Sequence, residues 1–232
     1  MQEEFKNTIH SIKGFRTSVQ FILGIFILVL GVNMMIRSHF GPAPWDTFTY
    51  HLHVLLNITL GMSAFIIQVF LIMIIIFLRR SYKYLYIFAS IITISIAFDF
   101  WDILVFRTYY PDNTALRIGF YLGGMVLLSF GLALVVLTRS KATVIDELML
   151  LLMDYFKTKN VFLTRITVES LGMILGLITA FIAGLGFGLI NQGTVFVTLV
   201  LPFLLSLQMR WMTPIFEVKR KSKKSLDLVD VL

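Results

Sequence analysis

The sequence predicts an all-α polytopic membrane protein with six transmembrane helices, arranged as an inverted repeat of three spans plus three. Its composition is typical of a membrane protein, because 58% of the 232 residues are hydrophobic and 14% are charged, against roughly 45–50% and 25% in soluble domains. Several apolar stretches approach the ~20 residues that cross a bilayer as a helix. The two halves of the chain also follow one order, namely a long span, a polar break and a short helix.

We predict six spans, at residues 18–36, 60–78, 84–106, 118–137, 170–190 and 194–208. They form one membrane domain over residues 18–211, with an N-terminal tail at 1–17 and a basic C-terminal tail at 212–232. Two further segments, 44–57 and 144–156, favour helices only about 20 Å long, which is too short for a ~30 Å hydrocarbon core. Each is therefore either a re-entrant helix that dips into the membrane or a helix that lies on its surface.

The internal repeat pairs residues 18–106 with residues 118–211. Asp46 and Asp146 stand one hundred positions apart, and each follows a polar break and lies at the start of a short apolar segment. Because one copy contains an odd number of spans, the second copy is inverted relative to the first. Duplicated halves with a helix break at matching positions are typical of transporters and channels.

Basic residues set the predicted orientation, since cytoplasmic loops carry an excess of Lys and Arg. In the six-span arrangement one face receives both tails and two loops, with the basic residues Lys6, Lys13, Arg16, Arg79, Arg80, Lys83, Arg139, Lys141, Lys157, Lys159, Lys219, Arg220, Lys221, Lys223 and Lys224. The opposite face receives Arg37, Arg107 and Arg117. We therefore predict a bacterial plasma-membrane protein with both termini in the cytoplasm. This distribution accounts for the net charge of +7 without a nucleic-acid partner.

The residues around the first polar break carry a resemblance. The run from Leu30-Gly31 to Gly41-Pro-Ala-Pro-Trp-Asp46, followed by the short helix and Leu60-Gly61-Met-Ser, resembles the glycine-proline-tryptophan-aspartate element of the YczE/YyaS/YitT family of bacterial membrane proteins. Asn191-Gln-Gly193-Thr194 is similar to a later Gly-x-Gly-Thr-like turn of that family. The resemblance covers about residues 21–211 and implies an integral inner-membrane protein, without implying a substrate.

Asp46 and Asp146 are the leading candidates for a substrate or ion pathway. Asp46 lies two residues after Pro44, a favoured first helical position, and Asp146 lies three residues after Thr143, close to a capping box. In one interpretation both carboxylates cap their helices and offset the helix dipole. In the other, the short helices meet near the membrane midplane, where the carboxylates bind a cation or relay protons. The two interpretations are compatible, because a capping carboxylate can also face a cavity.

Three more residues are candidates for the same pathway: Trp45, Asp99 and Gln68. Trp45 is either an interfacial anchor or a wall of the pathway. Asp99 shares a helix face with Asp102 near the outer end of the third span, where both carboxylates could simply be hydrated. Gln68 lies in the middle of the second span, and its alternative role is an interhelical hydrogen bond.

Glycines at small-xxx-small spacing are predicted to let helices pack closely, at Gly119, Gly123, Gly172, Gly176, Gly184 and Gly188. Charged residues near the start of the fifth span have a structural explanation as well. Glu169 lies four residues after Arg165, and the two are predicted to form an ion pair at the cytoplasmic boundary.

The sequence contains no motif of a metalloprotease, serine hydrolase or nucleotide-binding loop, and it has no cysteine. We therefore predict neither an enzyme nor a bound cofactor or metal. The leading interpretation is a small-solute secondary transporter or channel-like permease, whose partners are the lipid bilayer and an unidentified small solute. The alternative is a non-transporting accessory protein that supports a biosynthesis or export pathway. A homo-oligomer is compatible with both.

Overall fold

The computed structural model describes residues 2–138, 143–158 and 160–229, and every regular element in these ranges is helical. The α-helices are α1 Gln2–Ser38, α2 Pro44–Leu56, α3 Leu60–Arg79, α4 Phe88–Asp99, α5 Thr114–Leu137, α6 Val144–Tyr155, α7 Val161–Ile182 and α8 Gln192–Val229. A 3-10 helix, η1 Tyr82–Ile87, precedes α4, and a π-helix, η2 Phe100–Phe106, continues it. The predicted all-helical membrane fold is confirmed.

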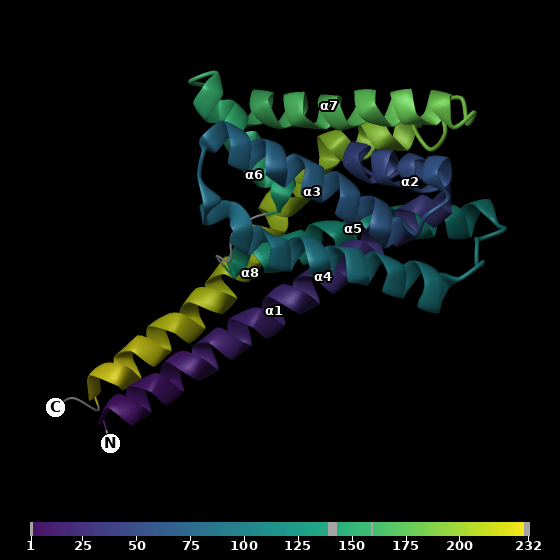
Figure 1. Ribbon diagram of the computed structural model, residues 1–232. Helices are drawn as coiled ribbons and strands as arrows, with labels where there is room; N and C mark the ends of the chain where they lie inside the picture. Colours follow the sequence, from purple (N-terminus) through teal and green to yellow (C-terminus); the bar gives the residue numbers. More distant parts are fainter. Residues whose placement is uncertain (1, 139–142, 159, 230–232) are drawn as a thin grey trace.

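Six helical stretches are long and apolar enough to cross a membrane: Arg16–Ser38, Leu60–Arg79, Phe88–Phe106, Thr114–Leu137, Leu163–Ile182 and Gln192–Thr213. The ends of α1 and α8 extend out of the bundle on the same side (Figure 1), as an even number of crossings requires. Three of the loop residues behind the predicted orientation, Arg139, Lys141 and Lys159, lie outside the described residues.

The two short helices form where the sequence predicts them, as α2 and α6. α2 packs mainly on α7, and Figure 1 shows it directly below that helix. α6 lies against α3 and α7. At 13 and 12 residues, both are too short to span a bilayer at 1.5 Å per residue.

The fifth span differs from its predicted position, because it covers Leu163–Ile182 rather than 170–190. The helix begins earlier because Asn160 caps it, with its side chain accepting from the backbone N–H of Leu163, and Arg165 and Glu169 pair with each other inside it, at 2.9 Å. It ends earlier because the apolar glycine segment that follows is a turn. Gly184 and Gly188 both have positive φ, at 74° and 57°, a conformation that glycine adopts without strain. The prediction that these two glycines pack inside a helix is wrong.

The tightest contact between helices is the crossing of α1 and α5. A Cβ atom added at Gly31 would lie 2.4 Å from the carbonyl oxygen of Gly124, and one at Gly131 would lie 2.6 Å from the carbonyl oxygen of Gly24. Only glycine lets two backbones approach this closely. This contact lies on a different face of α5 from the predicted pair, Gly119 and Gly123.

The predicted pair Gly119 and Gly123 does not make a close helix contact. A Cβ at Gly119 would meet nothing within 4 Å, and one at Gly123 would meet only the end of the Met34 side chain, at 3.5 Å. Gly172 and Gly176 do lie at a helix contact. They face α2, with the Trp45 ring 3.0 Å from a Cβ placed at Gly172.

Candidate functional site

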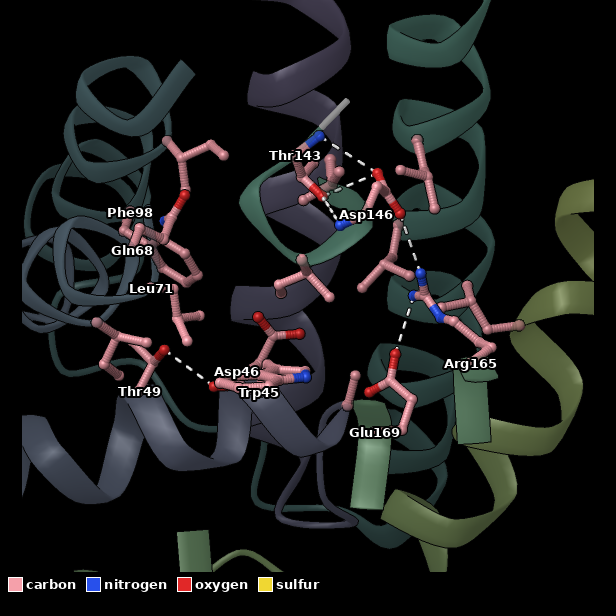
Figure 2. Close-up of a pocket in the computed structure, with 18 residues that line it drawn as sticks. Trp45, Asp46, Thr49, Gln68, Leu71, Phe98, Thr143, Asp146, Arg165 and Glu169 are labelled. Carbon is pink, nitrogen blue, oxygen red and sulfur yellow. Dashed lines mark hydrogen bonds and ion pairs between the residues drawn. The ribbon is translucent and has the colours of Figure 1, made fainter. Parts of the chain in front are cut away.

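A cavity of about 120 Å³ lies among the six apolar helices, and residues from the central part of five of them line it. Its apolar wall comes from five spans, through Leu28, Ile67, Ile94, Leu128 and Leu201. Each of these residues stands in the central part of its span. The starts of α2 and α6 complete the wall, so the cavity brings the two short helices to one place (Figure 2).

Asp46 and Asp146 both line this cavity, although one hundred residues separate them in the chain. Their location favours the re-entrant interpretation of the short helices over the interfacial one. A helix that lies flat on the membrane surface would not present its first turn to the middle of five spans. The two aspartates nevertheless differ sharply in their bonding.

Asp146 is fully bonded to its surroundings. Its carboxylate and the Thr143 side chain form a reciprocal capping box at the start of α6. One carboxylate oxygen, Oδ1, lies 3.1 Å from Arg165 Nη1 on α7, and the other, Oδ2, accepts from the Thr143 hydroxyl at 2.9 Å. The capping interpretation therefore holds for Asp146, which also ties α6 to α7.

Asp46 has no such partners. Ala43 occupies the N-cap position of α2 in an extended conformation, with no side-chain cap. Among the described residues, none forms a hydrogen bond or an ion pair with the Asp46 carboxylate, and Figure 2 shows this group facing the open space between the helices. Within the described part of the chain Asp46 therefore makes no capping hydrogen bond, although it lies in the first turn of α2, where its charge offsets the helix dipole. A carboxylate without a hydrogen-bond partner is costly among apolar side chains, so a ligand or a proton is a candidate for its partner.

The surroundings of Asp46 disfavour its charge. Part of its surface is accessible, but that part faces the cavity. Burial raises the pKa of Asp46 to about 7, with a smaller contribution from the negative charge of Glu169. Asp46 can therefore gain and lose a proton near neutral pH, which ordinary aspartates cannot do.

The predicted ion pair between Arg165 and Glu169 is present. The sequence did not predict that Glu169 is buried and lines the cavity together with Arg165. Its Oε1 accepts from Arg165, while its Oε2 has no hydrogen-bond partner among the described residues.

Of the other three candidate residues, two line the cavity and one does not. Trp45 and Gln68 line it. Trp45 is buried, and its indole N–H donates to the carbonyl of Val168 at 3.1 Å, so this residue is a wall rather than an interfacial anchor. Asp99 does not line the cavity. It accepts from the backbone N–H of Gly61 at 2.7 Å, at the start of α3, and this contact gives it a structural role outside this cavity.

His51 is a structural residue that the sequence did not single out. Its Nδ1–H donates to the carbonyl of Gly176 at 2.8 Å, and its Nε2 accepts from the backbone N–H of Leu189 at 2.9 Å. This pattern fixes the neutral tautomer. Burial lowers the pKa of His51, although the hydrogen bond to Gly176 opposes that change. The ring thereby ties α2 to α7 and to the turn before α8.

Replacing His51 by Ala should destabilise the protein by about 2 kcal/mol, because two buried backbone groups lose their partner. Thermal unfolding in detergent would measure the loss. His53→Ala is the matched control on the same helix, since His53 bonds only locally, to the carbonyl of Ile58. Equal losses from both variants would contradict a special role for the His51 ring.

Comparison with known proteins places the chain in a family. Residues 15–210 match the model of a family of unknown function, DUF6198. The chain belongs to this family. It is also similar to the uncharacterized protein YyaS of Bacillus subtilis strain 168, with 28% identity over 164 residues, which cover 71% of this chain and 81% of the relative. No solved structure matches the chain.

Proposed function

We propose that this protein is a small-solute secondary transporter or channel-like permease of the bacterial plasma membrane, and that the central cavity is its substrate site. The observation that carries this proposal is the unpartnered carboxylate of Asp46, which faces a cavity at the starts of two short helices, lined by the central parts of five apolar helices. Secondary transporters bind substrates and coupling ions near the bilayer midplane, where discontinuous helices end. A purely structural protein gains nothing from a free carboxylate there.

The same proposal includes an inverted repeat with both termini in the cytoplasm. In this arrangement α2 enters from outside and α6 from the cytoplasm, so their N-termini approach the cavity from opposite sides. The positive ends of both helix dipoles then point toward it, and Asp46 and Asp146 lie at those ends. Such a site can open alternately to either side when one half moves against the other.

Cysteine labelling tests this topology, because the chain has no native cysteine. We chose Leu56 and Tyr155, the exposed last residues of α2 and α6. Leu56→Cys should react with a membrane-impermeant reagent added from outside to intact cells. Tyr155→Cys should react only after the cytoplasm is opened. Labelling of both from the same side would exclude the inverted arrangement.

A solute-uptake screen in proteoliposomes, with and without a proton gradient, tests transport itself. We expect at least one small solute to accumulate, and a gradient to change its rate because Asp46 titrates near neutral pH. Empty liposomes, and liposomes with Asp46→Asn protein, are the controls. If correctly folded protein moves no solute in the screen, the accessory-protein alternative replaces transport.

A further inference from the structure

Resting on the proposed transport function, we infer that the substrate of the central cavity is a small organic cation, an ammonium group on a short apolar body. The ammonium would lie between Asp46 of α2 and the free oxygen of Glu169 of α7. The apolar body would lie against the middle of the spans.

The charges around the cavity leave a negative site without a partner. Three carboxylates and one guanidinium line it, on Asp46, Asp146, Glu169 and Arg165. Arg165 is already used, because it contacts Asp146 at 3.1 Å and Glu169 at 2.9 Å. Asp46 and the Oε2 atom of Glu169 therefore remain without a positive partner among the described residues.

Glu169 supports a ligand independently of Asp46. Only 8% of its side chain is exposed, and a buried carboxylate oxygen normally has a hydrogen-bond donor. In Figure 2 one of its oxygens is bonded to Arg165, and the other is directed away from Arg165, toward the side of the cavity where Asp46 lies. An ammonium group supplies up to three N–H donors and would satisfy both carboxylates at once.

The walls indicate an organic cation rather than a metal ion. No group of three or more histidine, aspartate or glutamate side chains in the described part of the chain could hold a metal ion. Most lining side chains are aliphatic or aromatic, and Trp45 and Phe98 are among them. Apolar walls stabilise a carbon body, and an aromatic face attracts an ammonium. At about 30 Å³ for each water-sized group, the cavity of about 120 Å³ holds roughly four such groups, the size of a small ammonium ion.

An anionic substrate fits this cavity poorly. Its charge would meet the carboxylates of Asp46 and Glu169 at low dielectric, where like charges repel strongly. The guanidinium of Arg165 could attract an anion, but both of its bonded amino groups already contact carboxylates. A neutral solute with an O–H or N–H group could donate to the Glu169 oxygen, but it would leave the negative charge at Asp46 without a positive partner.

Titration calorimetry on the full-length protein in detergent tests this inference directly. The probes are primary alkylammonium ions from methyl to hexyl and tetramethylammonium, with butanol, butyrate and sodium chloride for comparison. We expect saturable binding of at least one ammonium probe. Butanol, butyrate and sodium ions should bind at least tenfold more weakly. Binding of butanol or butyrate as strong as that of butylammonium, or no binding of any ammonium probe, would overturn the inference.

Substitutions of single carboxylates test where the ammonium group binds. Asp46→Asn and Glu169→Gln should each weaken ammonium binding at least tenfold. Asp154→Asn is the matched control, because Asp154 is an exposed carboxylate that pairs with Arg79, and neither residue lines the cavity. Its affinity should equal that of the wild type. If Asp46→Asn unfolds, Glu169→Gln alone decides, and wild-type affinity in a folded carboxylate variant contradicts the proposed location.

Binding should also depend on pH with a defined sign. Protons compete with the cation for Asp46, so affinity should fall about tenfold from pH 8 to pH 6, on either side of a pKa of about 7. The other titratable groups on the cavity are Asp146, Arg165 and Glu169. In Asp46→Asn the residual affinity for the ammonium probe should no longer change between pH 8 and pH 6. If it changes as much as in the wild type, another group is responsible for the pH dependence.

The outcomes separate this inference from transport. Ammonium binding without flux in proteoliposomes would support the ligand class and contradict transport. Flux of a neutral or anionic solute, without ammonium binding, would support transport and contradict the ligand class.

Discussion

Asp46→Asn should abolish most solute flux while leaving the fold intact. The carboxylate has no hydrogen bond or ion pair to lose among the described residues, and Asn has nearly the same shape. Removing the charge also removes the cost of burying it, so the stability of the variant should equal or exceed that of the wild type. A charged hydrogen bond to a ligand contributes about 1.5–3 kcal/mol, which corresponds to a roughly 10–100-fold loss of flux.

Asp146→Asn provides the contrast that makes the Asp46 result interpretable. Asp146 belongs to a capping box and to an ion pair with Arg165, so its replacement should lower stability by about 1–3 kcal/mol. Flux and the thermal unfolding midpoint should be measured for both variants with the solute that the uptake screen identifies. Wild-type flux in a folded Asp46→Asn protein would remove this carboxylate from the mechanism.

The spans and the short helices could be predicted because composition and length decide them. A 20-residue apolar run has few alternatives to a membrane helix, and a 13-residue run cannot take its place. The equivalent positions of Asp46 and Asp146 in the two halves also indicated that the two residues lie near one another in the structure. Both aspartates stand at equivalent points of their segments, and the structure places both on one cavity.

The bonding of those aspartates could not be predicted, because it depends on a third helix. Asp146 meets Arg165, whereas Asp46 meets no cation among the described residues. The position of Glu169 was missed for a related reason. Counting apolar residues assigns a charged pair to the membrane boundary, but two charges that neutralise each other can enter the span together. Their place beside the cavity follows from the packing of α7 on α2.

The spacing of the glycines did not predict the correct helix contacts, for a geometric reason. A small-xxx-small pair shows that a helix has a smooth face but not which way that face is turned. On α5 the residues Gly119 and Gly123 satisfy the spacing, yet the face that meets α1 contains Gly124 and Gly131. The turn at Gly184 and Gly188 was not predicted because its residues are as apolar as those of a span. The positive φ angles of these glycines, which distinguish the turn from a helix, are visible only in the structure.

Gly131→Ala should destabilise the protein by about 3 kcal/mol or more, the upper part of the range for overpacked cores. The new Cβ would lie 2.3 Å from the backbone nitrogen of Leu28 and 2.6 Å from the carbonyl oxygen of Gly24. Both atoms belong to the backbone of α1, so no side chain can rotate away. α1 and α5 would have to separate along a crossing that also forms one wall of the cavity. Thermal unfolding in detergent should show a lower midpoint, and solute binding should weaken with it.

Gly119→Ala is the matched control, because it makes the same chemical change on the same helix. Its Cβ would meet nothing within 4 Å. Alanine favours a helix over glycine by about 1 kcal/mol, so this variant should be as stable as the wild type or more so. The opposite signs of the two effects separate helix propensity from contact between backbones. Equal stability of Gly131→Ala and Gly119→Ala would show that α1 and α5 do not cross as closely as the structure describes. The close contact between these two helices could then not hold the cavity wall in place.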